Sequence, residues 1–125
     1  MRVGIVGGGQ LARMMALAGA PLGLHCSFLD PKEEVCAAPF GTHLNGAYDD
    51  LDLLRRLAQQ SDCLTWDFEN AAVEPLRAVS HNVAVRPSLA ALQASQDRLA
   101  EKRMLNELGV PTAGFHPVDA RPDLL

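Results

Sequence analysis

The first thirteen residues constrain the fold more than any other part of the chain. Val3, Ile5 and Val6 form a short β-branched run, three glycines follow, and apolar residues then recur at helical spacing. This order predicts a strand, a tight turn and a helix. Glycine suits such a turn because the backbone takes positive φ there and because no Cβ keeps a ligand's phosphate from the amides. The unpaired N–H groups at the start of the helix favour an anion, so we expect a phosphate or carboxylate at the turn.

The spacing Gly7-x-Gly9-x-x-Ala12 leaves three interpretations open. It fits the dinucleotide-binding fingerprint, with Asp30 at the end of the next apolar run as the ribose-binding carboxylate. The same turn can instead bind a phosphate or substrate, or be purely structural. Asp30 has a second interpretation too, because an aspartate before a proline commonly caps a helix, here over residues 32–38.

The helix that follows the glycine turn carries an apolar stripe along one side. Its members, spaced at i, i+3, i+4, i+7 and i+11, are Leu11, Met14, Met15, Ala18 and Leu22. Such a stripe is typical of a helix packed on a sheet. We therefore expect the stripe in the core, with the two methionines filling gaps there rather than forming an adaptable ligand surface.

Strand and helix patterns then alternate along the chain. Further strands are predicted over 24–29, 42–45, 63–66 and 83–85, and further helices over 51–58 and 73–79. This alternation predicts a Rossmann-like, three-layer α/β domain with an open, mostly parallel sheet of about five strands. We expect this domain to span residues 1–87, with residues 88–125 forming a helical linker and the start of another domain.

Polar residues follow the predicted strand at 63–66 directly, in the order Asp67, Phe68, Glu69, Asn70. The carboxyl ends of parallel strands line the ligand crevice of an open sheet. Glu69 and Asn70 are therefore expected on the same rim as the glycine turn.

Composition narrows the class of protein. The 125 residues carry a formal net charge of −4, which gives no basic surface for nucleic acid. We find no basic leader before the first strand and no apolar stretch of the roughly 18 residues that a membrane span needs, so we expect a cytoplasmic protein without a membrane partner. The three cysteines and four histidines show no metal-ligand spacing, and no metal site is predicted.

Several separated motifs agree with one family. They are Gly-Gly-Gly-Gln-Leu-Ala-Arg-Met at 7–14, Leu-Asp-Pro at 29–31, Gly-Ala-Tyr-Asp-Asp at 46–50, Leu-Thr-Trp-Asp-Phe-Glu-Asn at 64–70, Gln-Asp-Arg-Leu-Ala-Glu-Lys at 96–102 and Leu-Gly-Val-Pro-Thr-Ala at 108–113. In this order they resemble the start of the 5-(carboxyamino)imidazole ribonucleotide synthase family of purine biosynthesis. Two positions depart from the family pattern. Ala12 replaces a glycine, and Ala71-Ala72 replaces the Val-Pro that follows Glu-Asn. The second change is expected to loosen the segment that carries Glu69.

The resemblance implies a pre-ATP-grasp domain of an ATP-grasp ligase. In such enzymes ATP and bicarbonate give carboxyphosphate, and the amino group of aminoimidazole ribonucleotide is then carboxylated. The substrate-binding residues implied by the matching motifs are Gly9, Gln10, Leu11, Glu69 and Asn70. Arg98 matches an arginine that reaches the nucleotide phosphates, although a solvated linker arginine is the alternative. No catalytic residue is assigned.

The resemblance also sets an expectation about length. ATP and Mg²⁺ serve the full-length enzyme, but phosphoryl transfer needs a glycine-rich loop, lysines and metal-binding carboxylates that nothing after Leu108 supplies. We therefore expect no cofactor in this piece and no carbamate synthesis by it alone. The family commonly forms dimers through its N-terminal region, which implies a homodimer. The rival hypotheses are an NAD(P)-binding domain of an oxidoreductase and a binding module without catalysis.

Overall fold

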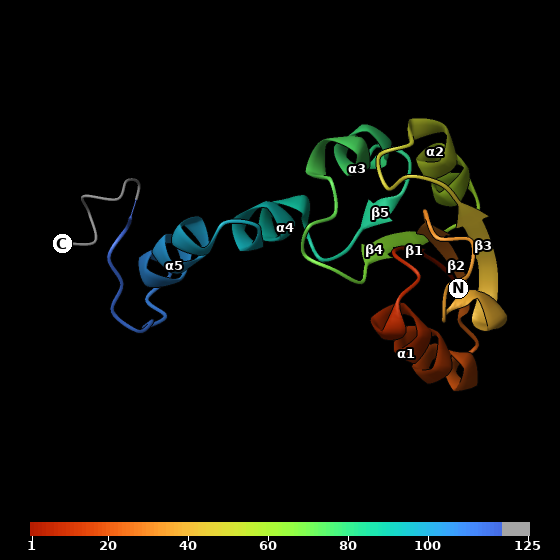
Figure 1. Ribbon diagram of the computed structural model, residues 1–125, viewed down its shortest axis with the longest axis horizontal. Helices are drawn as coiled ribbons and strands as arrows, with labels where there is room; N and C mark the ends of the chain where they lie inside the picture. The colour runs from red at the N-terminus through yellow and green to blue at the C-terminus, as the bar shows by residue number, and fades with distance from the viewer. Residues whose placement is uncertain (119–125) are drawn as a thin grey trace.

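A computed structural model describes residues 1–118 and contains one five-stranded sheet, in the order β3-β2-β1-β4-β5 (Figure 1). All neighbouring strands pair in parallel. The strands are β1 (Arg2–Val6), β2 (His25–Asp30), β3 (Gly41–Asn45), β4 (Cys63–Trp66) and β5 (Ala84–Val85). The predicted α/β class and strand number are confirmed. The sequence order reverses beside β1, so the switch point of the sheet lies between β1 and β4.

Helices cover both faces of the sheet. Their bounds are α1 (Gln10–Gly19), α2 (Leu51–Gln59), α3 (Val73–Val79), α4 (Leu89–Ser95) and α5 (Arg98–Glu107), with short 3₁₀ helices η1 (Ala20–Leu22) and η2 (Ala38–Phe40). Figure 1 shows α1 on one face, and α2 and α3 on the other. Side chains alternate along a strand, so Ile5 packs with the α1 side while its neighbour Val6 packs with the α2 and α3 side.

The predicted helix over residues 32–38 is wrong. Only η2 forms there, because the preceding segment folds back on the glycine turn, where the N–H of Ala37 donates to the carbonyl of Gly8 at 3.2 Å. The cap interpretation of Asp30 is met in part, since its Oδ1 accepts from the N–H of Lys32 at 3.0 Å. No helix follows that contact.

The predicted core stripe of α1 is wrong except at Met15, which is half-buried and packs against the core beside Ile5. The buried residues of the helix are the small ones, Ala12, Ala16 and Gly19, and these let the helix axis approach the sheet closely. Leu11 and Met14 are 58% and 60% exposed. The helix is apolar on more than one side, and periodicity alone does not distinguish a small-residue face from a large-residue face.

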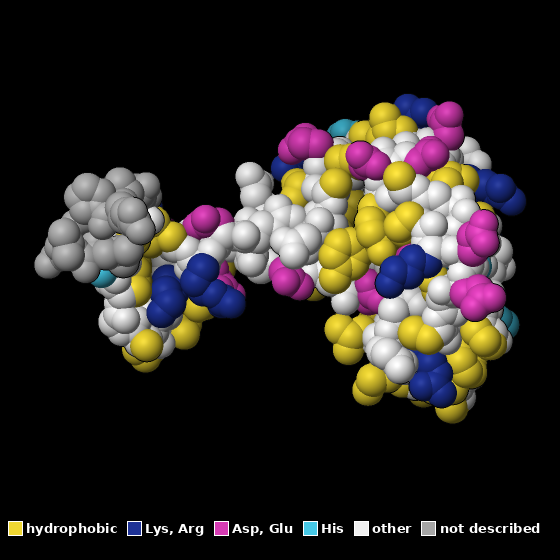
Figure 2. Space-filling model, in the orientation of Figure 1, with side chains coloured by type: hydrophobic (Ala, Val, Ile, Leu, Met, Phe, Trp, Pro, Cys, Tyr) yellow, Lys and Arg dark blue, Asp and Glu magenta, His cyan; other side chains and the backbone are white. Residues whose placement is uncertain are grey.

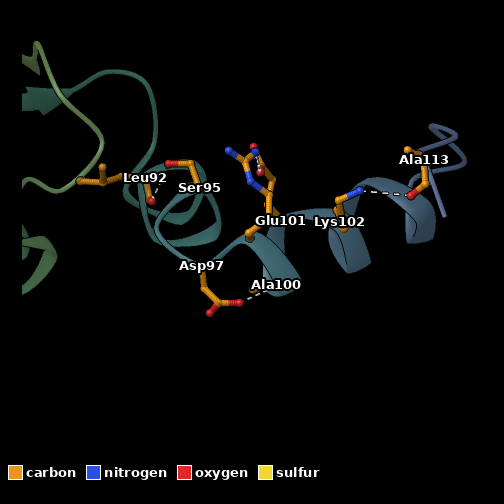
Figure 3. A network of polar contacts seen from close by, with 8 residues as sticks. Leu92, Ser95, Asp97, Ala100, Glu101, Lys102 and Ala113 are labelled. Atoms are coloured by element: carbon orange, nitrogen blue, oxygen red, sulfur yellow. Dashed lines mark hydrogen bonds and ion pairs between the residues drawn. The ribbon is translucent and has the colours of Figure 1, made fainter. Parts of the chain in front are cut away.

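Residues beyond β5 form an arm in two helices, α4 and α5, that extends from the sheet domain (Figure 1). Leu92 of α4 is buried in the main core, whereas α5 has no buried residue. Asp97 caps α5 by accepting from the N–H of Ala100 at 2.7 Å, and Lys102 donates to the carbonyl of Ala113 at 3.1 Å (Figure 3). The division at residue 87 stays a prediction, and residues 119–125 of the predicted linker lie outside the described residues.

Candidate functional site

The glycine turn and the segment after β4 lie side by side at the switch point. β1 and β4 are paired neighbours, with Val6 opposite Trp66, so Gly7 and Asp67 leave the sheet together. Glu69, one of the two residues expected on this rim, lies with Leu11 of α1 in one groove, whereas Asn70 does not line it. A groove with a volume of about 620 Å³ opens there. It is lined by Leu11, Met14, Met15, Ala18, Trp66, Asp67, Phe68 and Glu69.

The wall of this groove on the α1 side is apolar. Leu11 and Met14, predicted for the core, instead contribute to the groove, and Figure 2 shows apolar side chains gathered over α1. Met14 is therefore exposed in the wall of the groove, whereas Met15 lines the groove and also packs against the core. Across the groove, Glu69 supplies a carboxylate from the β4–α3 segment.

The ribose-binding interpretation of Asp30 is contradicted by its surroundings. Its side chain is 4% exposed, and its Oδ2 accepts from the N–H of Gly8 and from the hydroxyl of Tyr48, both at 2.9 Å. A Cβ on Gly8 would lie 2.9 Å from the side chain of Val35. The ribose side of a dinucleotide site is therefore filled by the chain itself, which removes the main support for the oxidoreductase hypothesis.

Asp67 occupies part of the expected anion site. Its Oδ2 accepts from the N–H of Gly9 at 2.8 Å. The sequence predicts a bound phosphate or carboxylate at this turn, but the N–H of Gly9 is paired with a side chain of the chain itself and is not available to a ligand. Sequence reasoning passed over Asp67 in favour of Glu69. The available signal was its position, the first residue after the strand beside β1.

The two carboxylates change the ionisation of their neighbours. Burial, which outweighs the hydrogen bonds from Gly9 and Ala12, raises the pKa of Asp67 above its ordinary 3.8, and the charge of Asp30 acts in the same direction. Burial, the hydrogen bond to Asp30 and the two nearby negative charges raise the pKa of Tyr48 to about 12. The turn is therefore surrounded by negative charge on both sides.

A second, polar cavity of about 340 Å³ adjoins the groove and brings three predicted site residues together. Its lining is Glu69, Asn70, Ser95, Gln96, Arg98 and Glu101. Arg98 pairs with Glu101. Gln10, in contrast, lines neither the groove nor this cavity; it is the exposed first residue of α1.

The backbone that carries Glu69 is held by Gln96. The Gln96 amide donates to the carbonyls of Glu69 and Ala71 at 3.0 and 2.7 Å. Ala71 is fully buried. These contacts anchor the segment in which the Val-Pro pair of the family pattern is replaced by two alanines.

Residues 1–118 do not by themselves fit a metal ion, because they hold no group of three His, Cys, Asp or Glu side chains placed to bind one. Within the same part of the chain, no helix is long and apolar enough to cross a bilayer.

Comparisons with known proteins agree with this architecture. N5-carboxyaminoimidazole ribonucleotide synthase of Pseudomonas aeruginosa is 44% identical over 124 residues, which are 99% of this chain and 34% of the relative. The crystal structure of N5-carboxyaminoimidazole ribonucleotide synthetase from Thermus thermophilus superposes with a TM-score of 0.89 at 48% identity, covering 98% of this chain and 34% of that one.

A third relative was solved with ligands. The Aspergillus clavatus N5-carboxyaminoimidazole synthase in complex with ADP and 5-aminoimidazole ribonucleotide gives a TM-score of 0.82 at 28% identity, over 90% of this chain and 31% of that one. The chain thus spans about a third of the length of these relatives. Residues 1–96 match the sequence model of the ribonucleotide synthetase preATP-grasp domain, and the chain belongs to that family.

Proposed function

We propose that the chain is the N-terminal part of an ATP-dependent ligase that carboxylates aminoimidazole ribonucleotide with bicarbonate to 5-(carboxyamino)imidazole ribonucleotide, in purine biosynthesis. Its part is to form the wall that faces the ribonucleotide. The observation that carries this proposal is that Glu69 borders both the groove along α1 and the polar cavity that contains Arg98. A ribonucleotide and a nucleotide phosphate would thus meet at one carboxylate, and a relative binds both ADP and the ribonucleotide.

The substrate contacts follow from the donors and acceptors on this wall. The N–H groups of Gln10 and Leu11, at the start of α1, would donate to the phosphate of the ribonucleotide. Glu69 would accept from its amino or hydroxyl groups, with Asn70 beside it. Gly9 would contribute bare backbone at the edge of the site, because Asp67 already takes its N–H.

Arg98 is proposed to contact the phosphates of ATP. Its side chain is 80% exposed and is paired with Glu101 at the edge of the polar cavity. An exposed ion pair of this kind contributes little to stability, so the guanidinium can turn to a phosphate at small cost. Arginine suits this task because its planar donors match phosphate oxygens.

The remaining requirements of the reaction are assigned outside residues 1–118, which hold no group of three His, Cys, Asp or Glu side chains placed to bind a metal ion. The glycine-rich loop that covers ATP, the activation of bicarbonate and the Mg²⁺ site are assigned to the part of the relatives that this chain does not span. A cytoplasmic homodimer completes the proposal. Two exposed apolar side chains that do not line the groove, Leu17 of α1 and Leu22 of η1, support an interface beside it.

The proposal is tested by titrating the ¹⁵N-labelled chain with aminoimidazole ribonucleotide and following its amide resonances. Shifts at Gln10, Leu11 and Glu69 are expected. Glu69→Gln should weaken binding about tenfold, since it removes one charge-assisted hydrogen bond. Glu33→Gln, an equal change of charge at an exposed side chain, should leave binding unchanged.

Two outcomes would contradict the proposal. One is micromolar binding of NADH without binding of the ribonucleotide, which would restore the oxidoreductase hypothesis. The other is ADP release above background by the isolated 125 residues with bicarbonate, ATP and the ribonucleotide, because these residues are assigned no phosphoryl-transfer machinery.

A further inference from the structure

We propose that Asp67 determines the specificity of this site: it leaves the start of α1 open to one phosphate monoester and closes the glycine turn to a diphosphate. The inference rests on the proposed function, in which the phosphate of a ribonucleotide meets Gln10 and Leu11. It adds that diphosphates are excluded from the site and that Asp67 is the residue that excludes them.

The first support is the distribution of backbone donors along the turn. The N–H of Gly7 donates to the carbonyl of Leu29 at 2.8 Å, and that of Gly8 donates to Asp30. None of the donors that a dinucleotide fingerprint would offer to a pyrophosphate at these two positions is therefore available.

Asp67 takes the donor that directly precedes the first helical residues. Its carboxylate accepts from the N–H of Gly9 at 2.8 Å. The next two N–H groups, those of Gln10 and Leu11, have no acceptor within residues 1–118. Two adjacent donors suit a single phosphoryl group. A second phosphoryl group would have to lie where the carboxylate of Asp67 already lies.

The glycines are the second support. A Cβ on Gly7 would stand 1.6 Å from Asp67 Oδ1, and a Cβ on Gly9 would stand 2.9 Å from Asp67 Oδ2. These glycines therefore make room for a side chain of the protein, at the place where a fingerprint glycine makes room for pyrophosphate. The turn resembles a dinucleotide site because the carboxylate of Asp67 takes the place that a pyrophosphate has there.

The experiment compares two probes on the chain of 125 residues. Ribose 5-phosphate represents the monoester and inorganic pyrophosphate represents the diphosphate, each titrated against the ¹⁵N-labelled protein. In the unsubstituted chain, ribose 5-phosphate should shift Gln10 and Leu11, and pyrophosphate should bind at least about tenfold more weakly. In Asp67→Ala, pyrophosphate affinity should rise about tenfold or more, with new shifts at Gly9 and Ala12.

Two further variants control for side-chain volume and for net charge. Asp67→Asn keeps the side-chain volume and removes the charge, and should show a smaller gain in pyrophosphate affinity even if Asp67→Ala does not fold. Asp49→Asn makes the same change of net charge at an exposed carboxylate and should show no gain.

The outcomes separate the two proposals. No gain in pyrophosphate affinity in either Asp67 variant, or tight pyrophosphate binding at Gly9 in the unsubstituted chain, overturns the role of Asp67. Failure of ribose 5-phosphate to bind the unsubstituted chain counts against the proposed function and the monoester half of the inference. A gain with pyrophosphate in the variants would still support exclusion by Asp67.

Discussion

The carboxylate of Asp67 accepts a 2.8 Å hydrogen bond from the backbone N–H of Gly9, 58 positions earlier in the chain. This contact joins the end of β4 to the start of α1 across the switch point of the sheet. It holds in register the two segments that supply Leu11 and Glu69 to the groove. The positions of the two proposed ligand contacts therefore depend on Asp67, which is itself assigned no contact with the ribonucleotide.

Replacing Gly7 with alanine should destabilise the chain by about 3 kcal/mol. Gly7 has φ of 112°, which side chains rarely adopt, and its added Cβ would meet the carboxylate of Asp67. Urea denaturation followed by circular dichroism measures the change. Gly114→Ala is the control, because nothing lies within 4 Å of a Cβ there. Equal stabilities of the two variants would refute the close approach of Asp67.

Asp67→Asn should gain stability relative to the unsubstituted chain as the pH rises. The pKa of Asp67 is raised in the folded state by burial, so between its ordinary value of 3.8 and the folded value the folded state binds more protons. The contribution of Asp67 to stability is then greatest below this window and falls as the pH rises through it. Urea midpoints measured from acidic to neutral pH test the sign. Asp49→Asn should show no such trend, and a parallel trend in both variants would contradict the assignment.

Tyr48 should ionise at a pH near 12 in the folded chain, because burial and Asp30 raise its pKa to about 12. It is the only tyrosine in the sequence, so ultraviolet absorbance of the phenolate reports it alone. The folded state binds more protons than the unfolded state between the ordinary pKa of 10 and this value, so its contribution to stability is lost across that window. Titration in denaturing urea is the control, with a midpoint near 10. A native midpoint equal to the denatured one would show that Tyr48 does not contact Asp30.

Ala16→Leu should destabilise the chain by about 1–3 kcal/mol through overpacking, whereas Met14→Ala should change stability by only about 0.5 kcal/mol. Ala16 faces the sheet and is 4% exposed, while Met14 faces the groove. Thermal denaturation of both variants measures the difference. A larger loss of stability in Met14→Ala than in Ala16→Leu would show that Met14, and not Ala16, packs in the core.

Leu92→Ala should cost about 2–5 kcal/mol, since this leucine of α4 is buried in the main core. Leu108→Ala, at a residue that is 70% exposed, should change stability by no more than about 0.5 kcal/mol. Denaturant titration of the two variants shows whether α4 unfolds with the sheet domain. A small effect at Leu92 would place the whole arm outside the cooperative unit.

The strands and most helices could be predicted because their signals are local. Cys63 to Trp66 form a strand and Val73 to Val79 form a helix, both with the predicted bounds. The face of α1 could not be predicted, because Ala12 and Ala16 are no less apolar by pattern than Leu11 and Met14 are. The position of Asp67 directly after a strand could mark it as a site residue, but its bond to Gly9 could not be predicted, since a long-range hydrogen bond leaves no periodic trace in the sequence. The helix predicted after Asp30 is wrong for a related reason, because the N–H of Ala37 pairs with the distant carbonyl of Gly8.

The small-residue face of α1 has a consequence for the cost of association. Ala12, Ala16 and Gly19 have no side-chain torsion angles to immobilise, so the helix docks on the sheet with almost no loss of rotamer entropy. The long side chains of Leu11 and Met14 keep their conformational freedom until something covers them. A ligand or partner that covers this helix immobilises these side chains on binding, and the lost conformational entropy lowers its affinity. We therefore expect moderate, readily reversible binding.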